Sequence, residues 1–188
     1  MSEPHFELAI LCTANRFRSP LAAELIRAET AGLAVAVGSF ATSGSSGRAP
    51  LAEALSRGRP LGLELDGHRA ARLRRGELQA ADLVLGFERS HVAAAVIEGG
   101  AARERTFTMP EFVPLAEQVS AQPGGPVERA RRVVEAAHAL RAETTSAKLA
   151  ELADPAGGPD RGYDTAAHEI AQLSRRLVRA LFGPGVRE

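Results

Sequence analysis

The sequence of 188 residues is poor in cysteine, in aromatic residues and in long apolar runs. With a single cysteine, Cys12, the chain cannot form an internal disulfide, and a cysteine-rich zinc site is excluded. No apolar run approaches the about 18 residues of a membrane-spanning helix. Residues 1–7 are too polar for a signal peptide. We therefore expect a cytoplasmic protein without a membrane partner.

An excess of charge of either sign is also missing, because 23 basic residues balance 23 acidic ones. This balance gives no electrostatic reason to expect a nucleic acid partner. Hydrophobic residues make up 45% of the chain and charged residues 24%, so a sizeable core can form. The length fits one domain of ordinary size, and we expect a single domain over residues 1–188.

Short apolar runs alternate with amphipathic stretches along the chain. The runs that favour strands lie at residues 6–11, 33–41, 82–87 and 105–108. The stretches that favour helices lie at residues 19–30, 50–57, 77–81, 90–97, 110 onward, 127–143 and 164–181. The alternation predicts a three-layer α/β/α fold, a member of the α/β class, whose central layer is a four-stranded parallel sheet.

The loop after the first expected strand carries the candidate chemistry. It reads CTANRFRS from Cys12 to Ser19, and Ser19 is expected to cap the helix that follows. The N–H groups of such a loop and the helix N-terminus can surround a tetrahedral dianion. A helix N-terminus and a nearby arginine, here Arg18, stabilise a thiolate, and the guanidinium fork matches two phosphate oxygens.

A lone cysteine at a strand end is more often an inert buried residue. Here the strand–loop–helix setting and the spacing to Arg18 favour a nucleophile instead. The loop residues expected to bind phosphate around Cys12 and Arg18 are Thr13, Ala14, Asn15, Arg16, Phe17 and Ser19.

The loop resembles that of the low-molecular-weight protein tyrosine phosphatase family, which reads Cys-x-Gly-Asn-x-Cys-Arg-Ser-Pro. The positions that match are Cys12, Asn15, Arg18, Ser19 and Pro20. The family's second signature, an Asp-Pro shortly before the last helix, is matched by Asp154-Pro155. The resemblance covers nearly the whole chain and implies a phosphatase that acts on phosphorylated protein side chains, with phosphotyrosine as the first expectation.

The resemblance also implies a mechanism. Cys12 attacks phosphorus, Arg18 and the loop hold the oxygens, and Asp154 protonates the leaving group before activating water. Inorganic phosphate is the product. No cofactor is implied, and we expect no metal because the five histidines are scattered without ligand spacing.

Two weaker matches imply residues that support the loop. Thr42, in Thr42-Ser43-Gly44, stands at a family serine position whose hydroxyl would brace Asn15. His68 stands in a segment similar to the family's Asp-His-x-x-Arg and would support the loop from behind; a surface histidine is the alternative.

Three departures bear on activity. Ala14 replaces the family glycine and would strain the loop if that position needed a positive φ. Phe17 replaces the second cysteine, so no protective disulfide can form and Cys12 is open to further oxidation. Ala156 replaces the aromatic residue that walls the substrate pocket, which weakens the case for phosphotyrosine.

Three alternatives to a tyrosine phosphatase therefore stay open. One is a protein-arginine phosphatase, since Thr13 after the cysteine occurs in both kinds of enzyme. Another is an arsenate reductase that uses a small-thiol partner, because a relay between internal cysteines needs more than Cys12. The third is an inactive phosphate-binding homologue whose loop is deformed at Ala14.

Overall fold

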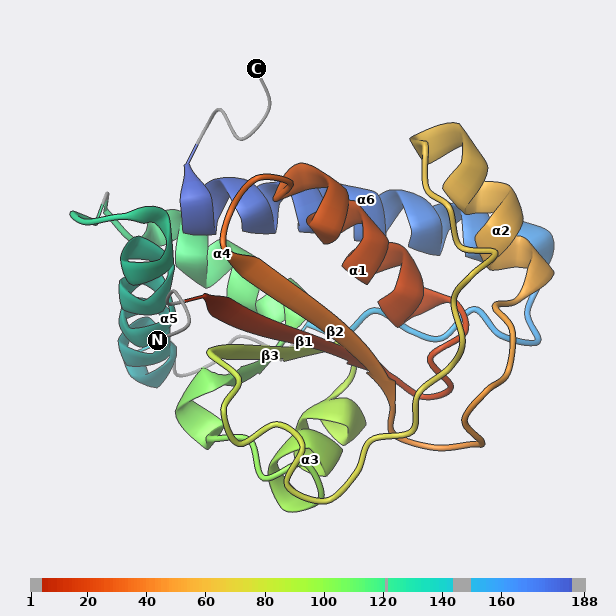
Figure 1. Cartoon of the computed structure of the whole chain (residues 1–188), viewed down its shortest axis with the longest axis horizontal. Helices are drawn as coiled ribbons and strands as arrows, with labels where there is room; N and C mark the ends of the chain where they lie inside the picture. The colour runs from red at the N-terminus through yellow and green to blue at the C-terminus, as the bar shows by residue number, and fades with distance from the viewer. Residues whose placement is uncertain (1–4, 121, 144–149, 184–188) are drawn as a thin grey trace.

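Four parallel strands form the centre of the fold (Figure 1). They lie in the spatial order β2-β1-β3-β4 and comprise β1 Phe6–Cys12, β2 Val35–Ala41, β3 Leu83–Gly86 and β4 Thr106–Thr108. The structure is a computed structural model that describes residues 5–120, 122–143 and 150–183. The three-layer α/β/α architecture expected from the alternation is confirmed.

Helices cover both faces of this sheet. The α-helices are α1 Arg18–Glu29, α2 Ala52–Gly58, α3 Arg89–Ile97, α4 Met109–Gln118, α5 Pro126–Glu143 and α6 Asp160–Phe182. Two 3₁₀ turns, η1 Arg59–Leu61 and η2 Arg103–Arg105, complete the elements. In Figure 1, α1 and α6 lie on one face of the sheet and α3 on the other.

The side chains of β1 alternate between the two faces, as the pleat of a strand requires. Leu8, Ile10 and Cys12 belong to the large apolar cluster that packs against α1, α4, α5 and α6. Ala9 and Leu11 belong to a smaller cluster on the side of α3. Cys12 therefore ends β1 on the face that α1 covers.

The helix expected at residues 77–81 is wrong, because residues 75–80 form turns. Two of their N–H groups bond to the segment after α3, while Gln79 N bonds to Gly76 O at 3.4 Å in a tight turn. Gly76 N donates to Glu98 O at 3.0 Å and Leu78 N to Gly99 O at 2.8 Å. Local turns together with these two tertiary hydrogen bonds thus take the place of a helix.

One expected helix cap also differs. α1 begins at Arg18, so Ser19 lies in its first turn, where its hydroxyl bonds to Cys12 and Asn15 rather than capping the helix. α3 is capped by Glu88, in a reciprocal box with His91.

The carboxyl ends of the parallel strands meet at one edge of the sheet, where ligands bind in open α/β folds. A late segment joins this edge: Leu152 N donates to Phe87 O at 2.9 Å, and Thr108 Oγ1 donates to Ala150 O at 2.9 Å. These bonds bring Asp154 to the same edge as the loop after Cys12.

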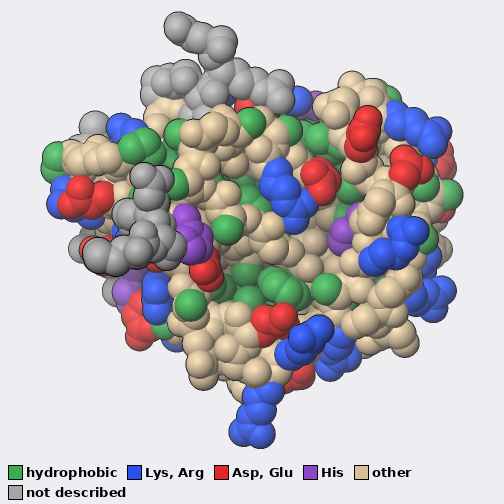
Figure 2. All heavy atoms as spheres, viewed as in Figure 1, with side chains coloured by type: hydrophobic (Ala, Val, Ile, Leu, Met, Phe, Trp, Pro, Cys, Tyr) green, Lys and Arg blue, Asp and Glu red, His purple; other side chains and the backbone are tan. Residues whose placement is uncertain are grey.

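The surface carries charges of both signs side by side on the face shown in Figure 2, without a broad area of one sign. Within the residues that the structure describes, no helix is long and apolar enough to cross a bilayer.

Candidate active site

The sulfur of Cys12 is held by its own loop. Sγ lies 3.0 Å from Ser19 Oγ and accepts the backbone N–H of Asn15 at 3.2 Å. The residue is 3% exposed. Asn15 has a φ of 52°, in the left-handed region that asparagine tolerates better than most residues. The positive φ thus falls on Asn15 and not on Ala14, so the strain considered for Ala14 does not arise there.

Asn15 is fully buried and fixes the loop through its side chain. Nδ2 donates to Ser19 Oγ at 2.8 Å and to Ser39 Oγ at 2.9 Å, while Oδ1 accepts from Ala71 N at 2.9 Å. His68 Nε2 lies 2.9 Å from the carbonyl oxygen of Asn15, so its ring contacts the backbone of the loop.

The hydroxyl expected from Thr42 comes from Ser39, so that expectation is wrong. Ser39 shares the α1 side of β2 with Val35 and Val37, whereas Phe40 packs on the other side. Position 42 is three residues further and therefore out of phase with Ser39 along the strand. Thr42 contributes a backbone bond instead, from its N–H to Cys12 O at 3.0 Å.

Arg18 is fully buried, and its guanidinium joins the loop to two other segments. Nη1 donates to Glu88 Oε1 and, at 3.0 Å, to Leu152 O. Nη2 donates to Asp154 Oδ2 at 2.5 Å and to Thr13 Oγ1 at 3.1 Å. The structure therefore brings Asp154, which lies 136 residues after Arg18 in the sequence, next to the loop that holds Cys12 and Arg18.

Asp154 lies on a loop that its own side chain shapes. Its Oδ1 accepts the N–H of Ala156 at 3.1 Å, and its side chain is 34% exposed. The loop is tied to α6, because Gly157 N donates to the hydroxyl of Tyr163 at 3.3 Å. The ring of Tyr163 packs edge-on against Phe17, with centroids 5.1 Å apart. The side chain of Phe17 thus supports the loop of Asp154 from the core.

The remaining loop residues point elsewhere. Ala14 is exposed, and Arg16 turns its side chain away to donate from Nε to Ala49 O at 2.7 Å. Their side chains do not meet Arg18, so any phosphate contact from these two positions falls to their backbone N–H groups.

Two residues of the site were not predicted from the sequence, Glu88 and His91. Both stand at the corner between β3 and α3. Besides the bond from Arg18 to Glu88, His91 Nε2 lies 3.1 Å from Thr13 Oγ1. Burial, followed by the positive charge of Arg18, lowers the pKa of His91 to about 4. The sequence signal was the GFERSH run at the end of the third strand, at the edge where ligands bind.

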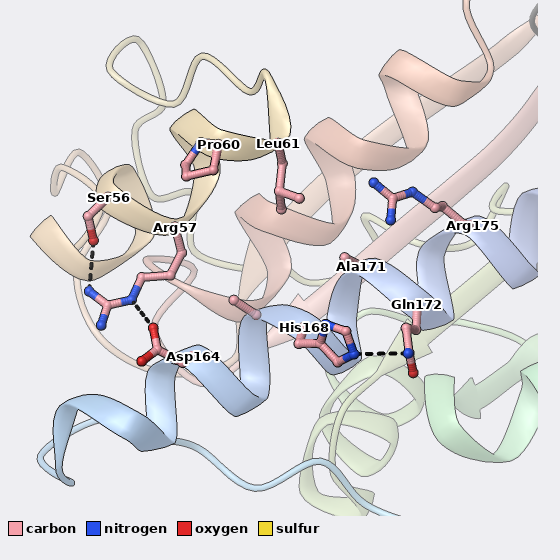
Figure 3. A pocket seen from close by; sticks show the side chains of 10 residues that line it. Ser56, Arg57, Pro60, Leu61, Asp164, His168, Ala171, Gln172 and Arg175 are labelled. Atoms are coloured by element: carbon pink, nitrogen blue, oxygen red, sulfur yellow. Dashed lines mark hydrogen bonds and ion pairs between the residues drawn. The ribbon is translucent and has the colours of Figure 1, made fainter.

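The described residues include no group of three or more His, Cys, Asp or Glu side chains placed to hold a metal ion. A separate hollow of about 420 Å³ lies between α2, η1 and α6 (Figure 3). At one end of it, Arg57 Nε donates to Asp164 Oδ1 at 2.9 Å. None of the residues of the Cys12 site lines this hollow.

Known proteins resemble this chain over most of its length. The sequence model of the low molecular weight phosphotyrosine protein phosphatase family matches residues 7–143. A protein-arginine-phosphatase of Geobacillus stearothermophilus is 32% identical over 178 residues, which are 94% of this chain and 96% of that protein.

Solved structures agree with the sequence match. The YwlE arginine phosphatase of Geobacillus stearothermophilus is 25% identical with a TM-score of 0.67, over 93% of this chain and 91% of that one. A low molecular weight protein tyrosine phosphatase of Bacillus subtilis is also 25% identical with a TM-score of 0.67, over 94% and 97%. The chain belongs to the low molecular weight phosphotyrosine protein phosphatase family and is a cysteine-dependent phosphatase.

Proposed function

We propose that the chain hydrolyses phosphorylated protein side chains with Cys12 as nucleophile, Arg18 as phosphate ligand and Asp154 as general acid. One observation carries the proposal. The sulfur is held at the start of α1 by Ser19 and the loop, and Arg18 of the same loop reaches Asp154 from the opposite end of the sequence at 2.5 Å.

The reaction has two steps. The thiolate of Cys12 attacks phosphorus, the bond from phosphorus to the leaving group breaks, and Asp154 gives its proton to the leaving atom. Arg18 and the loop N–H groups stabilise the oxygens of the transferring group. Asp154, now a carboxylate, takes a proton from water, which attacks the phosphocysteine and releases inorganic phosphate with the thiolate restored.

Arg18 links substrate binding to the acid. Its Nη2 donates to Asp154 in the structure, and a bound phosphoryl group competes for the same donors. Phosphate binding therefore loosens the hold of Arg18 on Asp154, which leaves this carboxyl group available to the leaving atom.

Phosphotyrosine is the first proposed substrate. The matched family is described as acting on phosphotyrosine, and a tyrosine phosphatase of Bacillus subtilis is among the similar structures.

Phosphoarginine is the second candidate, and two observations favour it. The relative that is 32% identical over nearly the whole chain is a protein-arginine-phosphatase. In addition, none of the seven phenylalanines and the one tyrosine is exposed, and Ala156 beside the acid has no ring. A phosphotyrosine ring would thus find no exposed aromatic partner to stack on.

The test compares a phosphotyrosine peptide with a phosphoarginine peptide of otherwise identical sequence. We expect phosphate release from at least one, complete loss in Cys12→Ser, and a decrease of about 10²–10⁴-fold in Asp154→Ala. The ratio of kcat/KM for the two peptides assigns the substrate. Unchanged release by Cys12→Ser would overturn the proposal. Binding of phosphate without any release would identify an inactive homologue, and arsenate-dependent thiol consumption would identify a reductase.

A further inference from the structure

His91 is a buried polar residue, 1% exposed, that the proposed mechanism leaves without a role. Its Nδ1 accepts two backbone N–H groups, from Phe87 at 3.2 Å and from Glu88 at 3.1 Å. An imidazole nitrogen that accepts hydrogen bonds carries no proton, so the single proton of the neutral ring is on Nε2. The corner between β3 and α3 therefore selects one tautomer.

That tautomer determines the role of Thr13. Nε2–H of His91 points to Thr13 Oγ1 at 3.1 Å, and Arg18 Nη2 donates to the same oxygen at 3.1 Å. A hydroxyl oxygen has two lone pairs, and these two donors use both. The Thr13 hydroxyl can then take part in a further hydrogen bond only as a donor.

The charge state of His91 keeps this arrangement constant. Burial and the nearby Arg18 lower its pKa to about 4, against the opposing influence of Glu88, Asp154 and Glu151. The ring is neutral at any pH near neutrality, and a second proton on Nδ1 would face the two N–H groups. His91 is therefore a permanent donor toward Thr13.

We propose that His91 is a positioning residue that makes Thr13 a hydrogen-bond donor to the phosphoryl group held by the Cys12 loop. Thr13 follows Cys12 directly, is half-buried, and shares Arg18 Nη2 with Asp154. Its hydroxyl hydrogen is thus available between the nucleophile and the acid. This inference rests on the proposed function, because it assigns a further donor to the same reaction.

The direct test removes the hydroxyl group. Thr13→Val preserves shape but has no donor, so kcat for para-nitrophenyl phosphate should fall roughly 10–100-fold, the usual effect of a hydrogen bond to a charged group. The dissociation constant for inorganic phosphate should rise in the same variant. Thr13→Ser restores the hydroxyl and should recover most of both losses.

Two substitutions of His91 separate its two contacts. Asn can accept the N–H groups of Phe87 and Glu88 but is too short to reach Thr13, so His91→Asn should keep the melting temperature and lose turnover. Gln can reach Thr13 with its amide but does not replace the acceptor at Nδ1. His91→Gln should therefore lose melting temperature and keep more turnover than His91→Asn.

A double-mutant cycle decides between positioning and a merely structural role. If His91 acts through Thr13, His91→Asn should have no further effect on kcat or on phosphate affinity in the Thr13→Val background. An equal effect in both backgrounds would overturn the inference. Phosphate affinity, measured by calorimetry, needs no turnover, so a wild-type chain without activity would refute the proposed function while the binding cycle still decides the role of His91.

Discussion

Arg18 places a full positive charge where it has no exposed surface, and two carboxylates balance it. In the proposed reaction Asp154 leaves Arg18, because the bound phosphoryl group replaces its carboxylate as the acceptor of Arg18 Nη2. Glu88 is not displaced in this way, since it accepts from the other nitrogen, Arg18 Nη1, which also donates to Leu152 O. Its negative charge therefore remains next to any bound dianion and weakens the binding of that dianion.

Replacing Glu88 by Gln should consequently tighten phosphate binding. The amide keeps a hydrogen-bond acceptor for Arg18 and removes the repulsion, so the inhibition constant for inorganic phosphate should fall several-fold. Competitive inhibition of para-nitrophenyl phosphate hydrolysis measures it. Glu151→Gln is the matched control, because it removes a nearby carboxylate that bonds to Arg89 rather than to Arg18. An inhibition constant that rises in Glu88→Gln would refute this reading of Glu88.

The lowered pKa of His91 predicts how the stability of the fold depends on pH. Its pKa is lowered from 6.5 to about 4, so in this interval the unfolded chain binds a proton at His91 and the folded chain does not. The contribution of the neutral His91 ring to the free energy of unfolding is complete above pH 6.5. It is lost as the pH falls toward 4.

Urea unfolding of the wild type should show this decline in the free energy of unfolding between pH 6.5 and 4.5. The decline should be shallower in His91→Gln, which has no titrating ring at this position. Parallel curves for the two proteins would contradict the assignment of His91 as a buried neutral residue.

At the scale of elements, the first strand, its loop and the first helix are local in sequence, which is why they could be predicted from residues 6–30. The site also needs the corner between β3 and α3, and its contacts to Arg18 and Thr13 depend on the order of strands in the sheet. The residues around Glu88 and His91 do not indicate which strands will be neighbours in the sheet. The error over Thr42 has a similar origin, since the strand phase that selects Ser39 depends on which face of β2 packs against α1.

Gly86 is required where β3 turns into α3. A Cβ at this position would lie 2.6 Å from His91 Cβ and 3.3 Å from Glu88 O. Gly86→Ala should therefore displace the corner, lower stability by about 1–3 kcal/mol and reduce kcat together with it. Gly67→Ala is the control, because a Cβ there meets nothing within 4 Å, and its melting temperature should match that of the wild type. A fully active Gly86→Ala would contradict the role of the corner.

At the scale of the whole molecule, Arg141 joins α5 to the sheet and to α4. Its Nη2 donates to Thr106 O at 2.7 Å, its Nε lies 3.0 Å from Glu111 Oε1, and its guanidinium stacks 3.4 Å over the Phe107 ring. Burial lowers the pKa of Arg141 to about 10, which still leaves it charged at neutral pH. The ion pair between Arg141 and Glu111 is therefore largely desolvated.

Arg141→Leu should destabilise the fold by about 3–5 kcal/mol, because it leaves the Glu111 carboxylate buried without its partner. Adding Glu111→Gln removes that charge and keeps an acceptor for the Thr108 N–H, so the double variant should recover part of the loss. Chemical denaturation measures both. A single variant as stable as the wild type would show that the pair contributes nothing.

The central claim, that Cys12 becomes phosphorylated, is tested most directly by rapid-quench kinetics with para-nitrophenyl phosphate and mass spectrometry of the quenched chain. The account predicts a burst of nitrophenolate close to one per chain and a phosphoryl group on Cys12. The burst should persist, with slower release of phosphate, in Asp154→Ala, since nitrophenolate needs little help from an acid to leave. Turnover without a burst and without phosphate on Cys12, or turnover that survives Cys12→Ser, would contradict it.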